Sequence, residues 1–478
     1  MRRLLVIPLL AAIFAFYAVT IRDGHVWDDD AAMYILHARN IAEGRPYSDT
    51  GYIFNPEYAA LGPVAYPPGL PLLLAPVWAA SGLNLYAMKL LEVGLFVASL
   101  AFLYALFRKH LGEPECLVLV SITGLCPMLW DQKEFIGSDL AFLPFLFLAL
   151  LAMERAYARA SPPRLGEAAP IGLLIWAAYA IRIIGMALLP TLIACDWLRT
   201  RRISRFAVVT TLVAVALCVT QSRFAHSEGA LLSLVRFDPQ TAIHNAWMYG
   251  KELRWFWLSG KLAIVSWILY GATLVAAAWG LLERLRRPAG LRIAELFLVF
   301  YAGFLLFYQP NEPRFLLPVF PIYVALAVEV AGRLIRRLRS PARVAVAAAL
   351  LAALGIGYSA QYAALDWGPI RESFLDDDFL QVADFVRSHT SESDVFLFRK
   401  PRVLPLLTGR RAATYAMQPG LGEFVRGLHP DYLVAVNAPA GIFASDADYL
   451  WPFIKAHAQS LQLAYRNSTY SIYRVLAP

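Results

Sequence analysis

Long apolar runs separated by short basic loops fill the first three quarters of the chain. A helix needs about 20 apolar residues to cross a bilayer. The runs that approach this length predict about eleven hydrophobic segments, at residues 4–20, 85–107, 116–130, 140–153, 170–180, 183–197, 206–219, 262–282, 293–307, 316–330 and 344–362. The predicted fold class is therefore an all-α polytopic membrane bundle.

The basic loops orient these segments, because Lys and Arg concentrate on the cytoplasmic side of a membrane. Residues 170–197 must then form two short segments that turn outside near Arg182. This places the N-terminus in the cytoplasm and everything after Tyr362 outside it, in a multi-pass protein of the cell membrane. The first segment is expected to be an uncleaved anchor, and a cleaved signal peptide is the alternative.

Composition supports a membrane protein. Hydrophobic residues make up 59% and charged residues 16% of 478 residues, whereas soluble domains average about 45–50% and 25%. These values exclude a disordered chain, a coiled coil and an ordinary soluble enzyme. The net charge of +8 comes mostly from the short loops, so membrane lipids are expected partners and nucleic acid is not. The four cysteines fall in apolar runs and are predicted to be small buried hydrophobic residues.

The last 116 residues differ from the rest. Residues 376–386 have the pattern of a capped amphipathic helix, 394–398 and 432–436 of buried strands, and 461–466 with 470–475 of a hairpin. We therefore predict two domains. Residues 1–362 form a transmembrane domain with an outer loop at 21–83, and residues 363–478 form a small extracytoplasmic α/β domain.

The outer loop carries an acidic run, Asp28-Asp29-Asp30, at the start of a predicted helix that ends near Gly44. Asp30, Tyr34 and His37 would share one face of that helix. Clustered carboxylates can provide a general base or bind a cation. The alternative is simple N-capping with a solvated acidic turn.

Other outer-face groups could bind a substrate. Tyr66-Pro67-Pro68-Gly69 predicts a stiff platform at the membrane surface, or merely the start of an interfacial helix. Glu134 and Asp139 lie at the mouth of a span, where ionisable groups are often functional, although Ser138-Asp139 would also suit a helix cap.

Two arginines lie at the outer headgroup level. Arg182 is in the predicted turn and Arg314 begins a later segment. Arg binds phosphate through a planar, permanently charged fork, so both are candidate phosphate ligands. The alternative is that they extend to ordinary lipid headgroups.

The order of these motifs resembles the C-type integral-membrane glycosyltransferases, in the branch of protein O-mannosyltransferases and aminoarabinose lipid A transferases. The motifs are Asp30-x-x-x-Tyr34, Tyr66-Pro67-Pro68-Gly69, Ser138-Asp139 and Arg314-Phe315-Leu316-Leu317-Pro318. Residues 399–402 and 407–411 resemble a C-terminal extension of many bacterial members. Phe315 stands where many relatives have Tyr, so a hydroxyl role there is lost.

The resemblance implies a hexosyl- or pentosyltransferase of the cell envelope. It would move a sugar, with inversion, from a polyprenyl-phosphate donor to a hydroxyl of a lipid, glycan or protein acceptor. Asp30 takes the role of catalytic base, with Asp29 as the substitute because the acidic run leaves the register open. Arg314 and Arg182 would bind the donor phosphate, and Tyr34, Tyr66, Pro67, Pro68, Glu134 and Asp139 would contact substrates.

Three questions stay open at the level of sequence. A monophosphate donor lessens the need for a metal, so no cofactor is assigned, and a divalent cation held by residues 28–30 is the alternative. A ligase or polymerase of lipid-linked glycans would use a similar topology, and a transporter of lipid-linked substrates would use the same arginines. The sugar and the acceptor are not specified by any motif.

Overall fold

The computed structural model describes residues 5–27, 29–56, 61–223, 225, 234–257, 263–286, 290–309, 311–370, 377–415, 421–437 and 446–476, with only the backbone of Asp29 included. The chain divides into two compact units. Unit 1 contains Met1–Ile21, Tyr86–Gln221 and Leu232–Trp367. Unit 2 contains Arg22–Leu85, Ser222–Leu231 and Gly368–Pro478.

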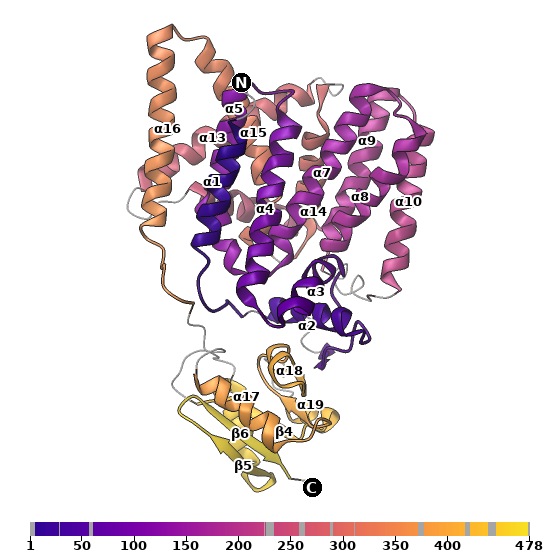
Figure 1. Ribbon diagram of the computed structural model, residues 1–478, viewed down its shortest axis with the longest axis vertical. Coiled ribbons are helices and arrows are strands. Elements are labelled where there is room, and N and C mark those ends of the chain that lie inside the picture. Colours follow the sequence, from indigo (N-terminus) through magenta and orange to yellow (C-terminus); the bar gives the residue numbers. More distant parts are fainter. Residues whose placement is uncertain are drawn as a thin grey trace. The chain divides into compact units, whose positions relative to one another are not determined.

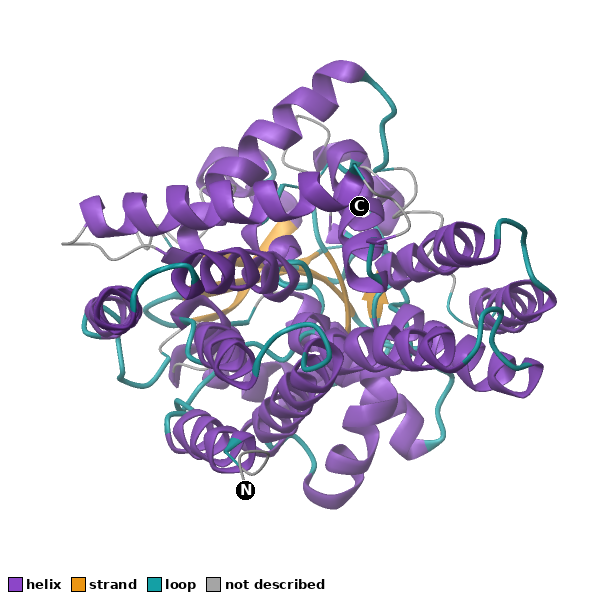
Figure 2. Cartoon of the chain, turned by 90° about the horizontal axis from the view of Figure 1, so that it is seen from above, coloured by secondary structure: helices purple, strands orange, loops and turns teal. Residues whose placement is uncertain are grey.

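Unit 1 is helical, and most of its long helices run in a common direction (Figures 1 and 2). Its helices are α1 (Val6–Val19), α4 (Leu85–Phe107), α5 (Glu113–Gly124), α6 (Pro127–Asp131), α7 (Ser138–Arg159), α8 (Ala168–Ile181), α9 (Leu188–Thr200), α10 (Arg205–Ser222), α12 (Pro239–Glu252), α13 (Ala263–Leu285), α14 (Ile293–Phe307), α15 (Phe320–Arg336) and α16 (Ser340–Tyr362). Short 3₁₀ turns are η3 (Gln132–Glu134), η4 (Leu165–Glu167), η5 (Ile183–Ala187), η6 (Leu253–Trp257) and η9 (Pro313–Leu316).

The predicted segments recur as helices, but the count of about eleven spans is not confirmed. Among the described residues, six helices are long and apolar enough to cross a membrane, or seven if the bent pair Glu113–Gly124 and Pro127–Glu134 is one span. Several other predicted segments form shorter apolar helices, such as α1 and α14. Hydrophobicity located these helices correctly, but length alone does not make each of them a full span.

Two breaks in the helices have local causes. The bend of 49° between α5 and α6 lies at Leu125-Cys126, just before Pro127, because proline disfavours helical geometry in the preceding residue. The backbone of Arg182 is extended and ends α8. This confirms the predicted interruption at Arg182, which separates two short segments.

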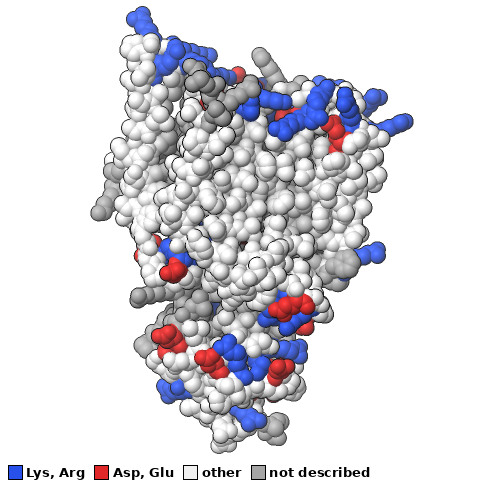
Figure 3. All heavy atoms as spheres, viewed as in Figure 1, with Lys and Arg blue, Asp and Glu red and all other residues white. Residues whose placement is uncertain are grey.

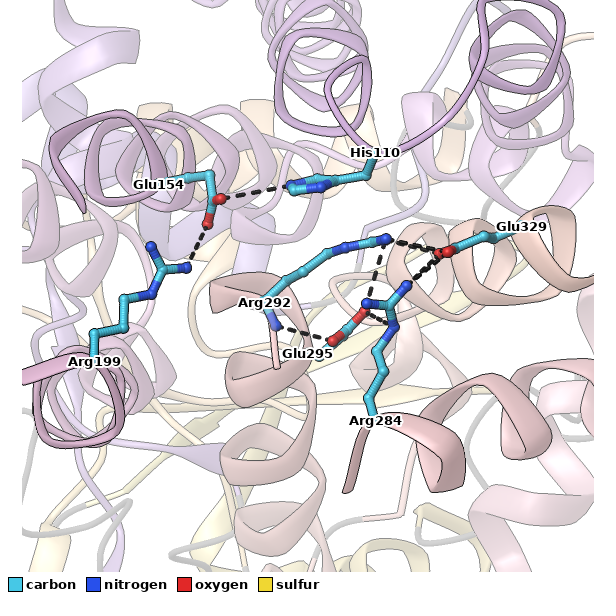
Figure 4. A network of polar contacts seen from close by, with 7 residues as sticks. All are labelled: His110, Glu154, Arg199, Arg284, Arg292, Glu295 and Glu329. Carbon is cyan, nitrogen blue, oxygen red and sulfur yellow. Dashed lines mark hydrogen bonds and ion pairs between the residues drawn. The ribbon is translucent and has the colours of Figure 1, made fainter. Parts of the chain in front are cut away.

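Charged side chains gather at one end of unit 1, where Lys and Arg predominate, and leave the middle of the bundle apolar (Figure 3). A network of ion pairs links the helices at that end (Figure 4). Arg284 of α13 and Arg292 at the start of α14 both bind Glu329 of α15, with N–O distances of 2.7–3.1 Å. Arg284 also binds Glu295 at 2.8 Å. Nearby, Glu154 of α7 pairs with His110 and with Arg199 of α9.

We expect Glu329→Gln to destabilise unit 1 by about 2 kcal/mol, because it removes one of the two carboxylates that Arg284 and Arg292 share, while Glu295 remains. The melting temperature in detergent should fall accordingly. Glu283→Gln is the matched control, since Glu283 is half exposed and, among the described residues, pairs only with Arg333 at the same end. Equal melting temperatures for the two variants would contradict a stabilising role of the network.

Unit 2 contains a small mixed sheet flanked by short helices. Its helices are α2 (Asp29–Glu43), α3 (Gly69–Ser81), α17 (Asp377–His389), α18 (Val403–Thr408), α19 (Leu421–Leu428) and α20 (Trp451–Ala456), with single turns η10 (Asp446–Leu450) and η11 (Ala458–Ser460). Its strands are β1 (Tyr52–Ile53), β2 (Val395–Leu397), β3 (Arg411–Ala413), β4 (Tyr432–Val436), β5 (Leu461–Arg466) and β6 (Tyr470–Val475).

The described strands have the order β1-β3-β2-β4-β6-β5. The first four are parallel, and β6 runs antiparallel to β4 and β5. The predicted hairpin and the strand at 432–436 are confirmed with the predicted bounds. The predicted amphipathic helix is α17, which buries Phe379, Val382 and Ala383.

The outer loop contributes a strand to this sheet. Tyr52 and Ile53 pair with Ala412 and Ala413, although they precede these residues by 360 positions. The sequence assigned residues 21–83 to the transmembrane domain, whereas the structure packs residues 22–85 with the C-terminal part of the chain. Asp30, in the first turn of α2, is likewise paired with Arg402 of the C-terminal part.

Candidate active site

The carboxylate of Asp30 lies in the first turn of α2 and is held by two donors from distant segments. The phenol of Tyr66 donates to Asp30 Oδ1 at 2.5 Å. Arg402 Nη1 lies 2.7 Å from Tyr66 Oη and 3.4 Å from Asp30 Oδ1. Burial raises the pKa of the Tyr66 phenol well above its usual value, so the phenol keeps its proton and donates. The side chain of Asp30 remains 31% exposed and is accessible to a substrate.

Arg402 is fully buried in a close-fitting cage. Its guanidinium carbon lies 4.7 Å from the ring centre of Tyr52 and 4.9 Å from that of Tyr66, which is cation–π geometry. Nη2 donates to the carbonyl of Pro63 at 3.3 Å. Gly62 has a φ of +97°, and a Cβ there would lie 3.0 Å from Tyr66 Oη and 3.2 Å from Arg402 Nη2. A side chain at position 62 would therefore be strained beside this pair.

His37, two turns along α2, fixes the backbone of Tyr66. The Tyr66 N–H donates to His37 Nε2 at 3.1 Å, and His37 Nδ1 lies 2.8 Å from the carbonyl of Tyr47. One nitrogen accepts and the other donates, which requires the neutral ring. Burial lowers the pKa of His37 from 6.5 to about 4, helped by the charge of Arg402 and opposed by the Tyr47 carbonyl.

This pKa predicts a loss of stability in acid. The unfolded chain binds the His37 proton near pH 6.5 and the folded chain only near pH 4, so the contribution is complete above pH 6.5 and declines as the pH falls towards 4. The full effect is about 3 kcal/mol. We expect His37→Gln to flatten the decrease in melting temperature between pH 7 and pH 4.5. The exposed His389 supplies the control variant His389→Gln, which should retain the decrease shown by the natural protein.

A second polar cluster lies in unit 1, where three predicted residues meet. Asp139, in the first turn of α7, accepts a hydrogen bond from Arg182 Nη1 through Oδ1. Its Oδ2 lies 3.8 Å from Arg314 Nη1, and Arg314 Nε lies 2.5 Å from Glu312. Both guanidinium groups face the ring of Phe315, at 5.6 and 5.8 Å. Asp139 is buried. Its one carboxylate therefore pairs with two guanidinium groups away from bulk water.

Glu134 belongs to a different pairing within unit 1. It lies 2.7 Å from Lys89 Nζ of α4 and also pairs with Lys133, and all three residues are buried. Lys133 also lies 3.4 Å from the ring centre of Trp130. The sequence analysis missed Lys89, although a lysine within an apolar segment of 23 residues is a signal of a functional or paired charge. Glu134 thus joins α4 to the turn η3 through two buried ion pairs.

The other residues that the sequence predicted for the site either lie near Asp30 or are not among the residues that the structure describes. The ring of Tyr34 packs 5.1 Å from that of Tyr66. Pro67 is buried and Pro68 immediately precedes α3. Asp28 and the side chain of Asp29 lie outside the described residues. Among the residues that are described, no group of three His, Cys, Asp or Glu could hold a metal ion. The cation at residues 28–30 therefore stays a prediction.

Arg402 is the main site residue that the sequence analysis did not assign. The sequence indicated residues 399–402 only through the resemblance to a C-terminal extension. Arg402 follows Asp30 by 372 positions. No local pattern indicates this contact, because the turn after β2 brings Arg402 to α2 through the tertiary fold. Lys400 of the same turn donates to the carbonyl of Trp27 at 2.6 Å, so this turn contacts the start of α2 twice.

The chain has the fold of the C-type integral-membrane glycosyltransferases. No protein-family model matches the sequence, and no curated protein sequence does either. The predicted resemblance is thus confirmed by structure.

Three solved structures illustrate the similarity. ArnT from Cupriavidus metallidurans, bound to undecaprenyl phosphate, has 14% identity and a TM-score of 0.59, with 99% of each chain covered. The Archaeoglobus fulgidus oligosaccharyltransferase in complex with Zn and sulfate has 14% identity and a TM-score of 0.59, over 89% of this chain and 68% of that one. The arabinofuranosyltransferase AftD from Mycobacteria has 15% identity and a TM-score of 0.58. The alignment covers 98% of this chain and 42% of AftD.

Proposed function

We propose that this protein is a membrane glycosyltransferase that moves a sugar from a polyprenyl-phosphate donor to an acceptor hydroxyl, with inversion, on the extracytoplasmic side. The observation that carries the proposal is the Asp30 carboxylate, partly exposed and held by Tyr66 and Arg402, in a chain with the fold of lipid-dependent transferases. A carboxylate oriented in this way can accept the proton of an attacking hydroxyl.

The chemistry divides between two groups of side chains. Asp30 accepts the proton as the acceptor oxygen attacks the anomeric carbon in line. The lipid phosphate leaves from the opposite face and gains negative charge. Arg182 and Arg314, which already hold the Asp139 carboxylate, would stabilise that phosphate in the same way, since preorganised donors act most strongly where charge develops.

The test is incubation of the purified protein with a panel of polyprenyl-phosphate sugars and acceptor fractions, with release of the lipid phosphate as the readout. Release that requires one sugar and one acceptor supports the proposal. Turnover only of pyrophosphate-linked oligosaccharides would identify a ligase or polymerase instead. Movement of intact lipid-linked sugar across vesicles without release would identify a transporter.

A further inference from the structure

We propose that Arg402, contributed by the C-terminal part of the chain, is a positioning residue for the catalytic carboxylate. This inference rests on the proposed role of Asp30. It assigns the tail a part in transfer itself, because the carboxylate of the outer loop is oriented by a guanidinium that lies beyond residue 362. A chain that lacked the tail would keep Asp30 but lose the group that orients it.

The contact between Arg402 and Asp30 differs from a solvent-exposed surface ion pair. Exposed pairs contribute little because water and salt screen them, but Arg402 is 0% exposed and Asp30 is 31% exposed. The guanidinium is clamped between the rings of Tyr52 and Tyr66 and bonded to the carbonyl of Pro63. A buried charge on so many fixed partners has one orientation, and it directs Nη1 at both Tyr66 Oη and Asp30 Oδ1.

Arg402 and Tyr66 therefore act as one unit. The phenol donates its proton to Asp30 and accepts a hydrogen bond from Arg402, so both residues hold the same carboxylate oxygen. Methionine at position 402 would preserve bulk but remove the polar contacts to Tyr66, Asp30 and the carbonyl of Pro63. We expect Arg402→Met to lower kcat by about 10- to 100-fold with little change in KM, since small displacements of a reacting group cost this much.

Arg410 provides a matched control. It is also a buried arginine of unit 2, but it bonds only to Thr390, Thr408 and the carbonyl of Arg387 in the described structure. Arg410→Met should lower the melting temperature and leave kcat per folded molecule within about twofold. Arg402→Lys, which keeps the charge without the fork, should retain more activity than Arg402→Met.

The experiment measures kcat and KM of the full-length protein in the donor assay for Arg402→Met, Tyr66→Phe, their double variant, Arg410→Met and Asp30→Asn. Coupled residues are non-additive, so the double variant should be no slower than the slower single one. If Arg402→Met has activity within twofold of the natural protein while Asp30→Asn is inactive, the role of Arg402 is wrong and the proposed role of Asp30 stands. A loss in Arg402→Met that merely follows its melting temperature, as in Arg410→Met, also overturns it. An active Asp30→Asn overturns the proposed base instead.

Discussion

Replacement of Asp30 by Asn is expected to lower the rate of sugar transfer by about 10²–10⁴-fold, the usual contribution of a general base. The amide oxygen of Asn can still accept the hydrogen bonds of Tyr66 and Arg402, so the local structure should persist. The amide cannot accept the proton of the attacking hydroxyl. The measurement is release of the lipid phosphate by purified protein, together with its melting temperature.

Glu43→Gln is the control for this variant, because Glu43 ends the same helix and pairs only at the surface with Arg45 and Trp78 among the described side chains. It should retain full activity. If Asp30→Asn still transfers sugar at a substantial rate, the base lies elsewhere in the acidic run. Asp29→Asn then tests the neighbouring register.

Replacement of Arg314 by Lys is the second large effect, with an expected loss of about 10²-fold in kcat, as for the removal of one preorganised donor to a developing anion. Lysine keeps the positive charge but presents a single point donor. Arg314 uses separate nitrogens for Asp139 and Glu312, and an ammonium group cannot reproduce that planar arrangement. Steady-state kinetics with a polyprenyl-phosphate sugar measure the loss.

Arg333→Lys is the corresponding control, since Arg333 pairs with the exposed Glu283 at the basic end of unit 1. Its activity should be unchanged. Equal activities of the two lysine variants would show that charge alone suffices at position 314, and a role as a phosphate fork would then be wrong.

The pattern along the chain was sufficient for most of the long helices and for β2, β4, β5 and β6, whereas α12, β1 and β3 were not predicted. Apolar runs located α4, α14 and β4 to the residue, and alternation located β5 and β6. Helix α2 begins within the predicted acidic run, at Asp29, and ends before Gly44, whose φ is +67°. These features depend on neighbouring residues only, through helix periodicity, strand alternation and the conformational freedom of glycine.

The sites required contacts between distant residues. Sequence proposed Asp139, Arg182 and Arg314 individually, and folding brought all three together. It proposed Asp30 and Tyr66 but gave no reason to join them to Arg402, or β1 to β3. Hydrophobic periodicity determines which segments become helices and strands. The pairing of a buried charge depends on which segments pack beside it, because only the tertiary structure decides which donors replace the water that each polar group loses.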